Sequence, residues 1–175
     1  MSPPCLRSGT QNDAAVVSAL SIQVFLDTYA TDGVCPDLAR EALREYSEQT
    51  FLARLCAPDR RFVLAENEGA LLGFAELDCI AKEAPAPGVR GVELVRLYVQ
   101  PRAQRTGVGG ALLAQAERIA RSLTAPFLWL TVWEGNARAL AFYARSGYAD
   151  VGATTYEFEG RKYGNRVVAK QLLPP

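Results

Sequence analysis

The residues best suited to chemistry are a carboxylate and a glycine-rich turn that follow each other along the chain. Glu93 opens an apolar, β-prone run over residues 94–99, and Gly107, Gly109 and Gly110 come shortly after it. Apolar residues then recur at helical spacing, so the order predicts a strand, a tight turn and a helix. Glycine lets the backbone approach a ligand closely, and the first N–H groups of a helix favour negative charge. The turn is therefore a candidate site for phosphate oxygens.

Two other phosphate-binding loops have a similar outline. The nucleotide triphosphate loop requires Gly-Lys followed by Ser or Thr, and this stretch has no Lys. The dinucleotide fingerprint requires Gly-x-Gly-x-x-Gly or Ala, and Leu112 stands where its third small residue should be. A glycine-rich turn without any ligand is the remaining alternative.

A second candidate segment lies downstream. Asn136 is a good N-cap for a helix that carries Phe142 and Tyr143, and Gly147 is a natural helix stop. From the residues alone, the Tyr143 ring is part of the core and its hydroxyl has a structural partner.

The sequence of the turn is similar to a known signature. Residues 104–109, Gln-Arg-Thr-Gly-Val-Gly, resemble the Gln/Arg-x-x-Gly-x-Gly/Ala motif of the GNAT superfamily of N-acetyltransferases. Residues 93–101 resemble the lead-in strand of that superfamily, and residues 136–148 resemble its second cofactor motif. The resemblance covers nearly the whole chain and is tightest over residues 93–152. One position differs, because Thr106 stands where a basic residue is frequent.

The resemblance implies that acetyl-CoA is the co-substrate and that its acetyl group is moved to a primary amine. It implies backbone contacts in which the Leu97 N–H faces the acetyl oxygen, Val99 pairs with the pantetheine arm, and residues 105–110 cradle the pyrophosphate. The implied cofactor-binding residues are Leu97, Tyr98, Val99, Gln104, Arg105, Thr106, Gly107, Val108, Gly109, Gly110, Asn136, Ala139 and Phe142.

The resemblance also implies two catalytic residues. Glu93 stands where many GNAT enzymes carry a general base, which is needed because a free alkyl amine is mostly protonated near pH 7. The alternative is a solvated carboxylate at the start of a strand. Arg96 is close in sequence, and as a charged neighbour it would weaken Glu93 as a base. Tyr143 matches the family tyrosine that protonates the departing thiolate.

The resemblance implies that the N-terminal helices line the acceptor cleft, with Phe25, Asp27 and Tyr29 as candidate substrate contacts. Residues 24–29, with Trp-Glu-Gly-Asn at 133–136 and a C-terminal Gly-x-x-x-Tyr-Glu-Phe pattern, look like the bacterial spermidine/spermine acetyltransferase branch. Carboxylates would pair a polyamine's cations, and the candidates are Asp27, Asp32, Glu134 and Glu157. A peptide N-terminus, a lysine side chain or an amine antibiotic is equally compatible.

Composition narrows the function classes. The chain has 175 residues, and its 19 Lys plus Arg balance its 19 Asp plus Glu, which argues against nucleic-acid binding. There is no histidine, so His-based metal sites and nucleophile pairs are excluded, and we predict no metal. No apolar run is long enough for a bilayer, no signal peptide is apparent, and the four scattered cysteines fit reduced thiols. We therefore expect a cytoplasmic protein without membrane partners.

The expected elements alternate through the chain. We expect a first strand at 5–7, a helix from Asp13 to about Tyr29, and a helical region over 37–55 with a break near Thr50. Strands are expected at 62–65, 71–77, 94–99, 126–132, 148–159 and 166–172, with a flexible loop over 81–91 and a turn at 160–164. This pattern predicts one domain over residues 1–175, in the α/β (α+β) class. It has a mixed, mostly antiparallel GNAT-like sheet of six to seven strands with helices on both faces.

The sequence thus predicts an acetyl-CoA-dependent N-acetyltransferase in which the amine attacks the thioester directly. The alternative is an acyl-CoA-binding sensor or interaction module without turnover. Dinucleotide binding is a third, weaker interpretation. Self-pairing of C-terminal edge strands into a homodimer is compatible with the sequence.

Overall fold

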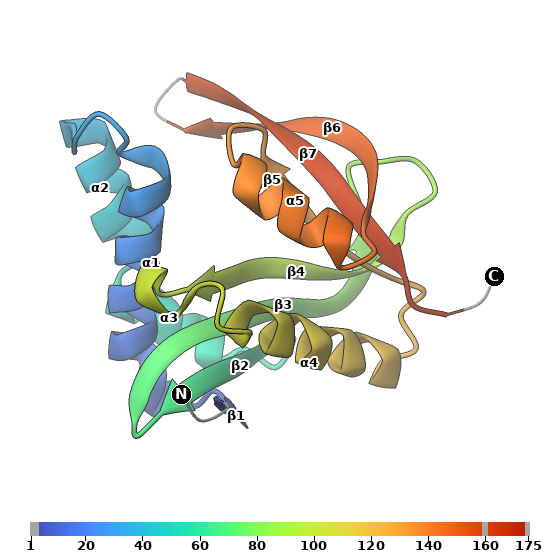
Figure 1. The fold of residues 1–175 in the computed structure, drawn as a ribbon, viewed down its shortest axis with the longest axis horizontal. Helices are drawn as coiled ribbons and strands as arrows, with labels where there is room; N and C mark the ends of the chain where they lie inside the picture. The colour runs from blue at the N-terminus through green and yellow to red at the C-terminus, as the bar shows by residue number, and fades with distance from the viewer. Residues whose placement is uncertain (1–3, 159–160, 174–175) are drawn as a thin grey trace. The chain divides into compact units, whose positions relative to one another are not determined.

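The computed structural model describes residues 4–158 and 161–173. The strands form a seven-stranded sheet in the order β1-β2-β3-β4-β5-β7-β6, in which β4 and β5 are parallel while β1–β2, β5–β7 and β6–β7 are antiparallel (Figure 1). This confirms the predicted mixed, mostly antiparallel sheet. The elements are β1 (Cys5–Ser8), η1 (Gln11–Asp13), α1 (Ala14–Tyr29), α2 (Pro36–Glu45), α3 (Glu48–Cys56), β2 (Arg60–Asn67), β3 (Ala70–Glu83), β4 (Arg90–Val99), η2 (Pro101–Ala103), α4 (Val108–Ser122), β5 (Phe127–Trp133), α5 (Ala137–Arg145), β6 (Ala149–Phe158) and β7 (Arg161–Gln171).

The chain forms two compact units. One consists of Met1–Leu77 with Arg96–Gln115, and the other consists of Asp78–Val95 with Ala116–Pro175. The three elements β3, β4 and α4 contribute residues to both units, so no linker in the sequence marks a boundary.

The first unit has helices on both faces of its strands. On one face, the rings of Phe62 and Phe74 pack with Phe51 of α3 and with Val17 of α1 in a single apolar cluster. On the other face, α4 lies against β3 at Gly73, where an added Cβ would stand 3.2 Å from Leu112. The same Cβ would stand 2.7 Å from the Tyr98 carbonyl oxygen, so only glycine allows this approach of β3 to β4.

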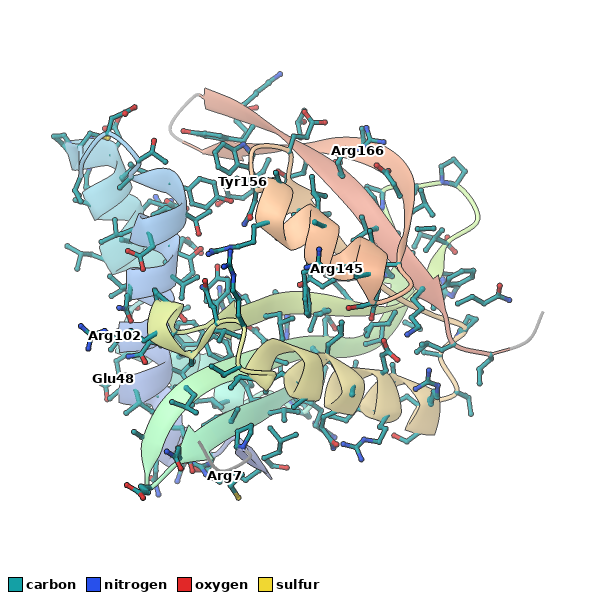
Figure 2. The ribbon with its side chains drawn as sticks, viewed as in Figure 1. Arg7, Glu48, Arg102, Arg145, Tyr156 and Arg166 are labelled. Atoms are coloured by element: carbon teal, nitrogen blue, oxygen red, sulfur yellow. The ribbon has the colours of Figure 1, made fainter. Side chains whose placement is uncertain are left out.

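The second unit is built on β5 and the β6–β7 hairpin. Trp129 packs with Val167 and Ala169 of β7, and its indole N–H donates to the Gly91 carbonyl at 3.2 Å. On β6, the carboxylate of Asp150 pairs with Arg166 of β7 at 2.7 Å, an exposed contact that holds the two hairpin strands together (Figure 2).

The first helix begins at an ion network. Arg7 on β1, labelled in Figure 2, bonds the carboxylates of Asp13 and Glu66, each at 2.6 Å. Asp13 also accepts from the backbone N–H of Thr10 at 2.7 Å, which fixes the turn before α1. The Arg7 guanidinium lowers the pKa of Asp13 well below its usual range, against the opposing effect of burial.

This network predicts a pH-dependent stability. We expect Arg7→Met to lower the free energy of unfolding at pH 7 by about 1–2 kcal/mol, since Arg7 is partly exposed. The folded pKa of Asp13 is depressed, so its contribution is complete above the unfolded value of about 3.9 and is lost as the pH falls below it. Urea unfolding from pH 7 down to pH 3 should show a constant difference between the wild type and the variant above about pH 4 and a narrowing difference below it. The control is Arg61→Met, whose guanidinium donates to the carbonyl oxygens of Pro58 and Arg60. A constant difference across pH would contradict this prediction.

Several element boundaries differ from those predicted. The break in the helical region lies at residues 46–47, not near Thr50, because Ser47 caps α3 by accepting from the Thr50 N–H at 3.2 Å. The predicted loop over 81–91 is wrong at both ends, since β3 continues to Glu83 and β4 begins at Arg90. Strand β7 begins at Arg161 and pairs with β6, so residues 161–164 are not a turn. Gly160 lies outside the described residues.

Candidate acyl-transfer site

The glycine-rich turn has the backbone shape of an anion-binding loop. Arg105 and Gly107 both adopt positive φ, at 64° and 92°, and α4 begins at Val108. Side chains hold the turn in place: the Gln104 amide donates to the Val99 carbonyl at 3.2 Å, and the Thr106 hydroxyl donates to the Ala103 carbonyl at 2.7 Å. The Thr106 hydroxyl therefore stabilises the turn itself. This fits a position that lacks the basic side chain frequent in the signature.

The first turn of α4 is open on its outer side. Val108 is buried and anchors the helix, whereas Arg105, Thr106, Gly107 and Gly110 are exposed. A Cβ added to Gly110 would meet no atom within 4 Å, so packing within the protein does not require glycine there. The N–H groups of the first helical turn have no partner within the helix, which leaves donors beside this open space. The residues present fit a phosphate group.

The parallel ladder between β4 and β5 is short. Its register joins Gly91 to Phe127, Val92 to Leu128, and Glu93 to Trp129, where the pairing recorded for these two strands ends. Both strands continue, β4 to Val99 and β5 to Trp133. Beyond Glu93, the backbone of β4, which includes Leu97 and Val99, therefore lies outside the register with β5 and presents a strand edge on that side. An edge of this kind can pair with an extended ligand.

Glu93 lies at the last pair of this ladder and binds a lysine. Its Oε2 is 2.5 Å from Nζ of Lys82 on β3, and the same Nζ lies 2.9 Å from Oδ2 of Asp78. The ammonium also lies 5.8 Å from the centre of the Trp129 ring. Burial lowers the pKa of Lys82, but its bonds to Glu93 and Asp78 outweigh this and raise it overall. Glu93 is thus a partly exposed carboxylate that Lys82 holds in one position.

The prediction that Arg96 is the charged neighbour of Glu93 was wrong. Arg96 bonds Glu76 at 2.6 Å, because the carboxylate of Glu76 is fully buried and requires cationic partners. Lys82 takes the place expected of Arg96. No sequence pattern indicates this contact, since residue 82 falls in the stretch predicted as a flexible loop.

Asn136 and Tyr143 occupy the predicted helix. The Asn136 side chain caps α5 by accepting from the Ala139 N–H at 3.0 Å, so its capping function is confirmed. Tyr143 is buried, and its ring packs edge-on against Phe142 at 5.1 Å and Tyr148 at 5.6 Å. The Tyr148 hydroxyl lies 3.4 Å from Glu117.

The acceptor candidates on α1 separate into two groups. Phe25 is buried and contacts the rings of Tyr29 and Tyr46 at 5.0 and 5.1 Å, whereas Asp27 is exposed. The hydroxyl of Tyr46 lies 3.4 Å from that of Tyr98 on β4. The structure therefore links Phe25 and Tyr29 to Tyr46, but it does not bring Asp27 into this aromatic group.

Comparison with known proteins identifies the family. The acetyltransferase (GNAT) family model matches residues 27–148. The chain belongs to this family. It is 28% identical over 138 residues to an uncharacterised N-acetyltransferase of Lactobacillus delbrueckii subsp. lactis, covering 79% of this chain and 80% of that one. The predicted fold and enzyme class of this GNAT chain are confirmed.

Relatives with more specific names are more distant. A spermidine N(1)-acetyltransferase of Thermoplasma acidophilum is 32% identical over 90 residues, which is 51% of each chain. The solved structure of the PaiA N-acetyltransferase from the same organism, in complex with coenzyme A, superposes on this GNAT chain with a TM-score of 0.76. It is 23% identical and covers 98% of this chain and 99% of its own, so the likeness is one of fold.

Within residues 4–158 and 161–173, no group of Cys, Asp and Glu side chains is arranged to hold a metal ion. Over the same residues, no helix has both the length and the apolar character needed to cross a bilayer.

Proposed function

We propose that this GNAT chain transfers an acetyl group from acetyl-CoA to a primary amine by direct attack on the thioester. The observation that carries this proposal is the early end of the β4–β5 ladder at Glu93, in the same chain as an open, glycine-rich start to α4. The β4 edge offers backbone hydrogen bonds to the extended pantetheine arm, and the start of α4 offers N–H donors to phosphate oxygens. The coenzyme A complex of PaiA, a protein of the same fold, supports this assignment.

Each candidate residue then has one task. Acetyl-CoA supplies an activated acyl group with a good leaving group. Residues 105–110 hold the pyrophosphate by backbone N–H groups, and the Leu97 N–H would stabilise negative charge on the acyl oxygen. The Val99 backbone pairs with the pantetheine arm. Tyr98, Asn136, Ala139 and Phe142 complete the proposed cofactor contacts, with Asn136 also serving as the cap of α5.

Proton transfer falls to two residues. Glu93 accepts a proton from the acceptor ammonium, directly or through water, so that a neutral amine attacks. Its Oε2 lies 2.5 Å from the Lys82 ammonium, which holds the carboxylate in one position. Tyr143 donates a proton to the departing thiolate.

The acceptor is a primary amine, and a polyamine is one candidate. It rests on the spermidine acetyltransferase relative and on the carboxylates Asp27, Asp32, Glu134 and Glu157. Two of these carboxylates have a cationic neighbour at 4.0 Å: Glu134 has Arg166, and Glu157 has Lys162. Release of coenzyme A thiol, measured with polyamines, amino acids, peptides and aminoglycosides in parallel, tests the proposal. Binding of acetyl-CoA without thiol release from any amine would favour the sensor alternative.

The open space at Gly110 gives a prediction that separates ligand binding from folding. We expect Gly110→Ala to keep or raise thermal stability, by up to about 1 kcal/mol, because alanine favours helix and meets no atom. The same methyl group would occupy the space of the phosphates, so the Kd for acetyl-CoA should rise about 10-fold. Calorimetric titration and thermal unfolding measure the two quantities.

Gly107→Ala is the matched comparison, since its added Cβ also meets no atom but its φ of 92° is strained for alanine. It should lose stability. Equal acetyl-CoA affinity in wild type and Gly110→Ala would remove the first turn of α4 from the proposed cofactor site.

A further inference from the structure

Two arginines of the first unit converge on one aromatic ring. The guanidinium carbons of Arg54 on α3 and Arg96 on β4 lie 5.4 and 5.8 Å from the centre of the Phe51 ring. Their side chains are mostly buried, with 24% and 13% of their surface exposed. Arginine is rarely buried to this degree without full pairing.

Each of these guanidiniums has an N–H group without a partner. Arg96 Nη1 bonds Glu76 at 2.6 Å, and Arg54 Nη2 lies 3.7 Å from Glu45. Arg96 Nε and Arg54 Nη1 are fully buried, and neither has a hydrogen-bond acceptor in the described part of the chain. Buried donors are almost always bonded, so two in one neighbourhood indicate that an acceptor group is missing.

The electrostatics indicate the sign of that group. The pKa of Arg54 is lowered, first by burial and then by the positive charge of Arg96. An anion bound beside these side chains would relieve the repulsion. Because hydrogen bonds from a guanidinium to a carboxylate are charge-assisted, a carboxylate oxygen satisfies such a donor better than a water molecule does.

Aromatic contacts connect these two arginines to the residues predicted to bind the acceptor. Arg96 lies 5.4 Å from the centre of the Tyr46 ring, and Tyr46 contacts Phe25 of α1, which in turn contacts Tyr29. Phe25 and Tyr29 were predicted as substrate contacts from the sequence. The arginine pair therefore adjoins the aromatic group on which the acceptor was expected.

We propose that Arg54 and Arg96 bind a carboxylate, and that this carboxylate belongs to the acceptor, an amino-acid-like molecule whose amine receives the acetyl group. The second part rests on the proposed acetyltransferase function. In this reaction the amine nitrogen bonds to the acetyl carbon, the C–S bond breaks, and coenzyme A leaves as the thiol. The proton lost by the amine goes to the base.

Matched acceptors provide the first test. Thiol release is measured with amino acids, with the carboxamides of the same amino acids, and with the corresponding decarboxylated amines. The wild type should have a kcat/KM at least about 10-fold higher for the acids, because a charge-assisted pair is lost in the others. Spermidine serves as the cationic comparison.

Variants provide the second test. Arg54→Met should raise the KM for the acids about 10-fold, with little change in kcat or in the KM for acetyl-CoA. Arg96→Lys keeps the charge and should cost less activity than Arg96→Met. Arg61→Met is the control, because its exposed guanidinium donates to the backbone carbonyls of Pro58 and Arg60. Independently of turnover, amino acids in low-chloride buffer should raise the melting temperature of the wild type but not of Arg54→Met.

The outcomes separate the two proposals. Acetylation of amides and polyamines as fast as of acids overturns the carboxylate inference and leaves the acetyltransferase function intact. Stabilisation by amino acids without transfer to any amine supports the carboxylate site but contradicts the acetyltransferase function. Equal stabilisation by chloride, acetate and amino acids, with no preference among acceptors, makes this a site for free anions and overturns the acceptor assignment.

Discussion

Tyr143→Phe is expected to lower kcat by about 10²-fold or more while leaving acetyl-CoA affinity nearly unchanged. The substitution removes one hydroxyl and keeps a buried ring that packs against Phe142 and Tyr148. If the hydroxyl protonates the departing thiolate, its loss affects the chemical step and not the binding of substrate. Single-turnover rates and calorimetric titration with acetyl-CoA measure the two effects separately.

Tyr148→Phe is the matched control. Tyr148 is equally buried, lies 5.6 Å from Tyr143 ring to ring, and directs its hydroxyl at Glu117. Its loss should lower stability with little effect on kcat per folded molecule. Equal rates for wild type and Tyr143→Phe would assign Tyr143 to the core alone.

Glu93→Gln has the second large expected effect. Glutamine keeps the size of the side chain but cannot accept a proton, so kcat/KM should fall about 10²-fold near pH 7. The loss should shrink as the pH rises toward the pKa of the acceptor ammonium, because more of the acceptor is then already neutral. A pH–rate profile of both enzymes from pH 6 to pH 10 tests this.

The pairing of Glu93 with Lys82 requires a control. Glu93→Gln also removes one of the two carboxylates on Lys82, and Asp78→Asn removes the other. If the base is Glu93, Asp78→Asn should retain most of the activity. Similar losses in both variants, independent of pH, would mean that Glu93 only balances the charge of Lys82.

The sequence was informative where a local rule governs the structure. The sequence predicts Asn136 as a helix N-cap, and its side chain accepts from the Ala139 N–H. This prediction succeeds because capping depends only on residues three apart. The apolar spacing of Leu112, Leu113 and Ala116 predicts a helix, and all three are buried on α4. The positive φ of Gly107 fits the tight turn expected between β4 and α4.

The sequence was less informative where pairing between strands determines the local structure. Pro85, Pro87 and Gly88 made residues 81–91 look like a loop, but β3 continues to Glu83 and carries Lys82 to Glu93. The early end of the β4–β5 register cannot be read from either strand alone. The unpaired N–H groups of Arg54 and Arg96 belong to residues 42 positions apart in the sequence, which only the fold brings to the same Phe51 ring.

The measurement that tests the central claim most directly is the mass of the acceptor after incubation with carbon-13-labelled acetyl-CoA. The amine panel is analysed with wild type, with Tyr143→Phe, and without enzyme. We predict that one class of primary amine gains the labelled acetyl group in proportion to released thiol, and that Tyr143→Phe slows this gain. Tight acetyl-CoA binding with no labelled product from any amine would contradict acetyl transfer as the function of this chain.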